Sequence, residues 1–441
     1  MSALQFSIRA AIIVVVWLTG GPASADLLGH GGMVRTLDFS ADGRRLVTGS
    51  FDFSAIVWDF EEQRQLAVLD GHEGPVTSAR FLPDGRILTT SDDRRAIIWE
   101  IAGKQPRVAH ELIGHSHKVM AGAISGDGRI AVTGGWDKTV RLWDTSSGRA
   151  VRTIQLPVPV NAVSFAENDE TIAVGGHDNL IRLFDVRSGR ALGKLAGHKM
   201  GITELRSSPD GKRLLSSSID KTLRLWNLQK QKAIRVMERH ESQVYGVRFS
   251  PDGRFAISGG GDGFIIIWEL TTGKPIKIIK AHEKIVWAVA VSPDGRFAVS
   301  GSSDDSARIW HIASGDRIGA VDTPENEPKP WLDSDHPGAG LFKKCARCHA
   351  LGPSGVRRSG PHFKDLFGRR VGTVPGYRYS KALEGRDFIW DRETLFKLFD
   401  QGPDKFLPGT KMPVQRVTDR EKLTHLVDYL KELTGSKASH D

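Results

Sequence analysis

Short apolar segments separated by turns recur along the first three-quarters of the chain. Seven of these segments end in an aromatic residue, and successive aromatic residues lie 41, 44, 41, 42, 42 and 42 positions apart. They are Trp58, Trp99, Trp143, Phe184, Trp226, Trp268 and Trp310. Turns such as Ala41-Asp42-Gly43, flanked by alternating apolar positions, are typical of short β-strands. A fixed period of this length predicts a repeat architecture in which each unit forms one small sheet.

Two further residue types recur with this period. An aspartate stands six residues before each aromatic residue, at Asp52, Asp93, Asp137, Asp178, Asp220, Asp262 and Asp304. Six units begin with a histidine, in Gly29-His30, Gly71-His72, Gly114-His115, Gly197-His198, Arg239-His240 and Ala281-His282. Over residues 29–322 the pattern closely resembles the WD-repeat family, which implies four strands per unit and a closed seven-bladed β-propeller. A hydrogen-bonded chain through these residues would rigidify each blade, so we interpret them as structural rather than catalytic or metal-binding.

Two departures from the repeat give specific expectations. The fourth unit has Phe184 in place of tryptophan and Leu156-Pro157 in place of Gly-His, so we expect this blade to lack the buried polar network and to be looser. Only Asp26–Leu28 precede the first Gly-His pair, whereas Ser314–Asp322 has the pattern of an outer strand. We therefore expect the ring to close without exchange of a strand from the N-terminus.

The N-terminal 25 residues have the pattern of an export signal. Arg9 precedes the apolar stretch Ala10–Leu18, and Ala23-Ser24-Ala25 is a small-x-small cleavage site. The apolar stretch is well short of the ~20 residues that a membrane-spanning helix needs. We expect cleavage after Ala25, export to the periplasm and no integral membrane segment in the mature chain.

Composition limits the possible partners and the compartment. The formal net charge is +9, but acidic residues lie between the basic ones and no basic run suggests a nucleic-acid partner. The two cysteines, Cys345 and Cys348, exclude a disulfide framework. The absence of other thiols fits an oxidising compartment.

The repeat ends before a proline- and acid-rich stretch, 323–337, which we interpret as a linker. Residues 338–435 then have a helical pattern, with helices expected at Gly338–Cys345 and Asp419–Leu433, and 436–441 form a tail. The chain is thus predicted to be multidomain: a signal peptide (1–25), an all-β propeller (26–322), the linker, and an all-α domain.

Residues 345–349 read Cys-Ala-Arg-Cys-His, the spacing at which two thiols attach to haem and the histidine faces the iron. Three alternatives compete with this interpretation. A zinc site would need further ligands, and there is no third cysteine. A redox dithiol would prefer a strand-to-helix setting. The third alternative is a histidine that follows the cysteine pair by chance.

From Gly338 to Thr434 the chain closely resembles class I cytochromes c, through Gly338–His349, Gly360-Pro361, Leu366–Arg369, Pro375–Ser380, Trp390 and Leu407–Pro413. The resemblance implies one haem c bound covalently through Cys345 and Cys348, with His349 and Met412 as axial iron ligands. It also implies that the Pro361 carbonyl accepts the His349 ring proton and that Arg369, Tyr379 and Trp390 hold the haem propionates. Gly338, Phe342, Leu426 and Tyr429 would form the contact between the terminal helices. Leu398 stands where a tyrosine often bonds the methionine sulfur.

Two strong iron ligands leave no open position, which favours outer-sphere electron transfer over catalysis at the haem. We expect an acidic redox partner at a basic haem edge, formed by Lys343, Lys344, Arg347, Arg370 and Lys411. The propeller would dock a protein through one rim, which carries Phe51, Met120, Trp136, His177, Ile219, Tyr245 and Trp287. Two alternatives remain: a redox enzyme whose propeller holds a substrate or second cofactor and uses the haem as internal acceptor, and a purely structural propeller.

Overall fold

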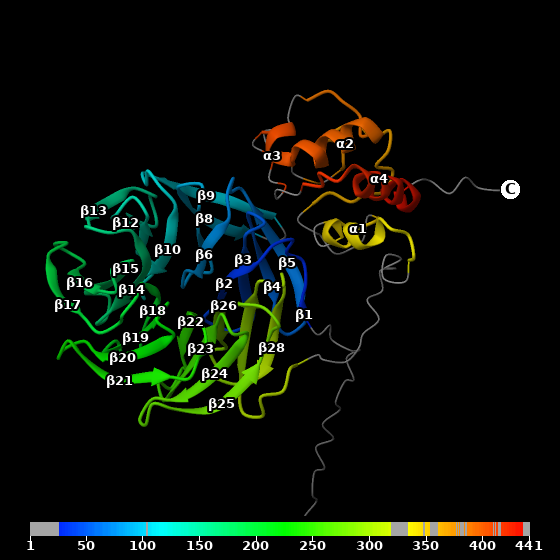
Figure 1. Ribbon diagram of the computed structural model, residues 1–441. Coiled ribbons are helices and arrows are strands. Elements are labelled where there is room, and N and C mark those ends of the chain that lie inside the picture. The colour runs from blue at the N-terminus through cyan, green and yellow to red at the C-terminus, as the bar shows by residue number, and fades with distance from the viewer. Residues whose placement is uncertain are drawn as a thin grey trace, which may run out of the picture.

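The computed structural model describes two groups of elements, a ring of strands and a set of helices (Figure 1). The described residues are 26–102, 105–318, 334–346, 349–352, 360–375, 377, 379, 383, 386–408, 410, 412 and 416–434. The expected signal peptide, most of the expected linker and the expected tail lie outside the described residues. No helix within the described ranges is long and apolar enough to cross a membrane.

Seven four-stranded antiparallel sheets form the ring, which confirms the seven-bladed propeller. Six blades use four consecutive strands, and in each the first strand lies innermost, beside the first strands of the neighbouring blades. Blades one to three are β2 (Val34–Phe39), β3 (Arg45–Ser50), β4 (Ser54–Asp59), β5 (Arg64–Asp70); β6 (Val76–Phe81), β7 (Ile87–Ser91), β8 (Arg95–Ala102), β9 (Gln105–Ile113); and β10 (Val119–Ile124), β11 (Ile130–Gly135), β12 (Thr139–Asp144), β13 (Ala150–Gln155). Blades four to six are β14 (Val160–Ala166), β15 (Thr171–Gly176), β16 (Ile181–Asp185), β17 (Ala191–Leu195); β18 (Ile202–Ser207), β19 (Arg213–Ser218), β20 (Thr222–Asn227), β21 (Lys232–Glu238); and β22 (Val244–Phe249), β23 (Phe255–Gly260), β24 (Phe264–Glu269), β25 (Lys274–Lys280).

The repeated histidine, aspartate and tryptophan form the expected buried network in six blades. In the first blade, His30 Nδ1 lies 2.9 Å from Asp52 Oδ2 and His30 Nε2 lies 2.7 Å from Thr48 Oγ1, which also accepts the Trp58 indole proton at 2.9 Å. The carboxylate accepts the Nδ1 proton, so Nε2 accepts from the hydroxyl. The same role falls to Thr89, Thr133, Ser216, Ser258 and Ser300 in the other five networks.

The fourth blade replaces that network with apolar packing, as expected. Leu156, Val174 and Phe184 belong to one hydrophobic cluster, and all three side chains are buried. Val174 stands where the other blades have serine or threonine, a change that the sequence analysis overlooked. Asp178 instead pairs with Arg182. The three apolar substitutions fit one another, so the blade is packed with no polar group left over among them.

Ring closure differs from the expectation. The seventh blade consists of β26 (Val286–Val291), β27 (Phe297–Ser302), β28 (Ala307–His311) and, at its outer edge, β1 (Asp26–Leu27) from the N-terminus. The described part of the segment after β28 pairs with that strand through the β-bridge of Arg317 to Trp310 and the hydrogen bond from the Ile318 N–H to the Ile309 carbonyl at 2.8 Å, and residues 319–322 of the expected outer strand lie outside the described residues. Closure without strand exchange was therefore wrong. Two residues suffice because Leu27 is buried in the core and the Asp26 carboxylate pairs with both Arg308 and Arg317.

The described part of the C-terminal region contains the helices α1 (Ala339–Cys345), α2 (Arg392–Gln401), α3 (Pro403–Phe406) and α4 (Arg420–Thr434). The helices expected at both ends are present to within one residue. Helix α1 packs against α4, where the Phe342 and Tyr429 rings meet edge to face at 5.7 Å. A Cβ on Gly338 would lie 2.2 Å from the His425 carbonyl oxygen, so only glycine permits this close crossing. Their shared core also includes Leu395, Leu398 and Phe399 of α2.

Candidate haem site

The Cys-x-x-Cys-His segment begins at the last residue of α1. Cys345 is buried in the core of the helical region, and the His349 N–H donates to the Cys345 carbonyl at 3.0 Å. This hydrogen bond ties the backbone of the histidine to that of the first cysteine. Cys348 lies outside the described residues.

The His349 imidazole is held in one orientation by three neighbours. Its Nδ1 lies 2.6 Å from the Pro361 carbonyl oxygen. A carbonyl can only accept, so Nδ1 carries the proton and Nε2 carries the lone pair, which is the form that binds a metal. The ring stacks on Phe363 at 4.5 Å and 16° between planes. A Cβ on Gly360 would come within 2.4 to 2.7 Å of the imidazole, so any side chain there would displace it.

Met412, the other expected iron ligand, lies after α3 and packs half-buried against the core that contains Phe363. Its backbone N–H donates to the Thr410 hydroxyl at 3.3 Å. Leu398 stands where the resemblance to class I cytochromes c would place a tyrosine, and its side chain is buried in the same core. The two expected ligand residues therefore both adjoin this one core: the imidazole stacks on Phe363, and Met412 packs against the cluster.

The three residues expected at the propionates are all partly buried. The Trp390 N–H donates to the Arg369 carbonyl at 2.9 Å, next to the isolated β-bridge between Arg370 and Ile389. Arg369 donates from Nη1 to the Lys364 carbonyl at 2.7 Å, and Tyr379 accepts the Val374 N–H at 3.1 Å. Burial lowers the pKa of Arg369 and raises the pKa of Tyr379.

The structure describes only part of the expected basic haem edge, and the sequence analysis missed two residues of the site. Lys343 and Arg370 are exposed, and Arg370 pairs with Asp387 at 3.1 Å; the side chains of Lys344, Arg347 and Lys411 lie outside the described residues. Phe363 and the tight fit at Gly360 were not identified from the sequence. The only available signals were an aromatic residue two positions after Pro361 and a glycine just before it.

Five of the seven expected propeller rim residues fall into two groups. Met120, Tyr245 and Trp287 line one cavity at the centre of the ring, and the Tyr245 and Trp287 rings lie 4.2 Å apart. Trp136 forms a separate group with His177, and the centroids of their rings lie 5.4 Å apart. Phe51 and Ile219 do not line the central cavity. The expected rim is therefore divided between the channel and its surroundings.

Comparisons with known proteins match both parts of the chain. A family model described as the IFT122 first beta-propeller matches residues 9–263, and the WD domain, G-beta repeat model matches 273–311. Cytochrome c of Sesamum indicum is 40% identical over 99 residues, 22% of this chain and 88% of that protein. Cytochrome c2 of Blastochloris viridis is 37% identical over 102 residues, 23% of this chain and 80% of that protein. The chain belongs to both the WD-repeat propeller and the cytochrome c families.

The cytochrome c relatives imply a covalently bound haem c. The residues present fit that group by their chemistry. A buried thiol, an imidazole with its Nδ1 proton fixed and a thioether adjoin one apolar core, and Gly360 keeps the imidazole side clear of any side chain. We call the helical region that contains α1 to α4 and the haem site the cytochrome domain below.

Proposed function

We propose that this protein is an exported electron carrier with one haem c, attached through Cys345 and Cys348 and bound axially by His349 and Met412. The observation that carries the proposal is the hydrogen bond from His349 Nδ1 to the Pro361 carbonyl, one turn beyond Cys345. It selects the imidazole tautomer that an iron ligand needs. Such a partner also raises the basicity of the ligating nitrogen.

The residues of the candidate haem site have distinct roles in this proposal. The haem, when bound, supplies a one-electron iron couple. Pro361, Phe363 and Gly360 orient the imidazole, and Met412 offers a soft thioether, a ligand type that raises the iron potential. Arg369, Tyr379 and Trp390 bind the propionates. Burial lowers the pKa of Arg369, and a propionate anion beside it would offset that effect by stabilising the charged guanidinium.

The finer architecture is part of the proposal. The domain is an all-α class I cytochrome c, supported by the close crossing of α1 and α4 at Gly338. The segment boundaries at 25, 322, 337 and 435 follow from the sequence pattern. Export to the periplasm is supported by the signal-like N-terminus.

We also propose that the propeller docks a redox partner protein. The supporting observation is the pair Tyr245 and Trp287 at the central cavity, with Arg35 stacked 4.7 Å from the Trp287 ring. Aromatic and arginine side chains are the common anchors of protein interfaces. Co-purification from the native host tests this role, with Trp287→Ala expected to lose a partner that the parent retains.

The haem proposal is tested on the full chain made in a host that attaches haem. We expect a mass equal to the polypeptide from Asp26 plus one haem, and a low-spin spectrum. Met412→Ala should open the iron to carbon monoxide, whereas Met200→Ala, an exposed methionine of the propeller, should behave as the parent. A bare polypeptide mass would contradict the haem, and a Met412→Ala spectrum like that of the parent would contradict the distal ligand.

A further inference from the structure

The centre of the propeller contains a cavity lined by the innermost strands of all seven blades. Its empty volume is about 450 Å³, including the space open to solvent. Four arginine side chains line it: Arg35, Arg80, Arg206 and Arg248. They come from four different blades, so only closure of the ring brings them together.

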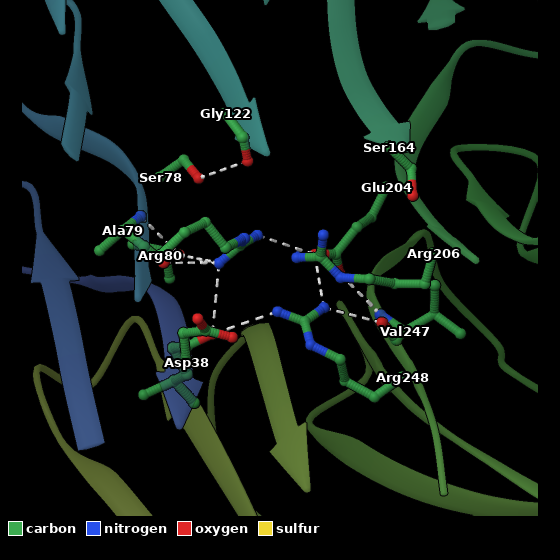
Figure 2. Close-up of polar contacts among 12 residues, drawn as sticks. Asp38, Ser78, Ala79, Arg80, Gly122, Ser164, Glu204, Arg206, Val247 and Arg248 are labelled. Carbon is green, nitrogen blue, oxygen red and sulfur yellow. Dashed lines mark hydrogen bonds and ion pairs between the residues drawn. The ribbon is translucent and has the colours of Figure 1, made fainter. Parts of the chain in front are cut away.

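Three of these arginines share one carboxylate. Glu204 Oε1 accepts from Arg206 and from Arg248 at 2.6 Å each and from Arg80 at 3.4 Å. Its other oxygen, Oε2, accepts the Val247 N–H of the next blade at 2.8 Å. Figure 2 shows the guanidinium groups gathered around this carboxylate. Both oxygens of Glu204 are therefore in use.

The channel carries more positive than negative charge. Against the four arginines stand Glu204, which lines the cavity, and Asp38 and Asp92, which lie close enough to act on these arginines. Asp92 is itself paired with Lys118, and the Asp38 carboxylate accepts the Phe81 N–H at 2.9 Å, so a surplus of two positive charges remains. The side chains of Arg80, Arg206 and Arg248 are only 13%, 15% and 12% exposed. Keeping two unbalanced charges in so little water is costly unless a counter-charge is present.

The titration behaviour points the same way. Burial lowers the pKa of Arg80 to about 10, and repulsion by Arg248 adds to that effect. Burial and the neighbouring arginines lower the pKa of Arg206 well below its usual value. Burial alone would raise the pKa of Glu204, but Arg206, Arg248 and Arg80 together hold it at about 2.

Bracing of the ring explains some of these arginines but not all. Arg80 and Arg248 each donate to the Leu37 carbonyl of the first blade, at 3.3 and 3.1 Å, and so tie blades together. Arg206 donates to no backbone carbonyl among the described residues. Its Nε, like that of Arg80, is buried without a hydrogen-bond partner in the part of the chain that the structure describes. Among the described residues five further propeller arginines also have an unpartnered Nε, so Arg206 is set apart by its place in the cavity and by its lack of a backbone partner.

We propose that the channel of the propeller binds a small oxyanion with two negative charges, of the phosphate or dicarboxylate class. Guanidinium groups bind such oxyanions through paired N–H donors, and a dianion balances the two positive charges of the channel. The site lies in the propeller and does not depend on the haem proposal.

Calorimetry on the full haem-loaded chain tests the site directly, with sodium phosphate and sodium succinate as separate titrants. Saturable binding of one or both supports the proposal, and the tighter titrant identifies the source. Sodium chloride at matched ionic strength is the control for general screening, which acts on all exposed charges. If neither dianion binds saturably, or if chloride has the same effect, the proposal is wrong.

Arg206→Gln should weaken the binding at least about tenfold, which corresponds to 1.4 kcal/mol. Arg149→Gln, an exposed arginine of the outer propeller surface, should bind as the parent does. Arg206→Lys retains the charge without the paired donors and should fall between the two. Parent-like affinity in Arg206→Gln would overturn the assignment. Should that variant fail to fold, the parent calorimetry and Arg206→Lys decide the question.

Discussion

Histidines in the two domains are held in the same way and used differently. In six propeller blades Nδ1 bonds an aspartate at 2.8 to 2.9 Å, and Nε2 takes a hydrogen bond from a buried serine or threonine. In the cytochrome domain His349 Nδ1 bonds a backbone carbonyl at 2.6 Å, beside the cysteine pair. The same tautomer thus serves rigidity where a hydroxyl faces Nε2, and in the haem site that we propose it presents Nε2 to the iron. The neighbours, rather than the histidine, decide the role.

The largest expected effect separates the stabilities of the two domains. Gly338→Ala places a Cβ 2.2 Å from the His425 carbonyl oxygen, and a backbone atom of α4 cannot yield easily. We expect a loss of about 3 kcal/mol or more from the cytochrome domain alone. Urea unfolding followed at the haem absorbance should shift, while propeller unfolding followed by far-ultraviolet strand signal should not.

Gly340→Ala is the matched control for that substitution. This glycine also belongs to α1, but a Cβ there would meet nothing within 4 Å. Alanine favours a helix over glycine by about 1 kcal/mol, so the control should be neutral or slightly stabilising. A shift of both domains in Gly338→Ala would show that they unfold as one unit and would break the comparison.

The next effect compares polar and apolar blades. Ser258→Ala leaves the Trp268 indole and His240 without their shared buried partner, at a cost of about 2 kcal/mol. Val174→Thr makes the opposite change in the fourth blade, where the new hydroxyl would lie near Leu156 and Phe184, and should also cost about 2 kcal/mol. Thermal unfolding of the propeller measures both. If adding the hydroxyl proves neutral, the fourth blade has room for water and is the looser blade that its sequence suggests.

Features that repeat along the chain could be predicted from the sequence, whereas features that occur once could not. The blades and their polar networks could be predicted because one spacing recurs seven times along the chain, so that each copy strengthens the interpretation of the others. The wrong closure prediction took Asp26–Leu28 as too short for a strand and Ser314–Asp322 as the outer strand, whereas the observed strand has two residues, too few to show alternation. Phe363 and Val174 were missed because each occurs once in its context. Arg80 and Arg206 were not recognised as neighbours because 126 positions separate them and only the closed ring joins them.

A smaller effect concerns the dependence of propeller stability on pH, which follows from the buried histidines of the blades. Burial lowers the pKa of His115 and of His198 below the usual 6.5, despite their aspartate partners. Between the lowered pKa and 6.5 the unfolded chain binds more protons than the folded one, so propeller stability falls as the pH drops through that range. Urea midpoints measured between about pH 7 and pH 5 check this. A constant propeller midpoint would contradict it.

The smallest expected effect tests ring closure. Asp26→Asn keeps the two-residue strand β1 and the buried Leu27 but removes the charge that pairs with Arg308 and Arg317. These partners are partly exposed, so we expect a loss of about 1 kcal/mol from the propeller. Asp316→Asn, on the other segment beside β28, is the control and should change little, because it has no ion pair among the described residues. Equal effects of the two substitutions would mean that the segment after β28, and not the N-terminal strand, holds the ring closed.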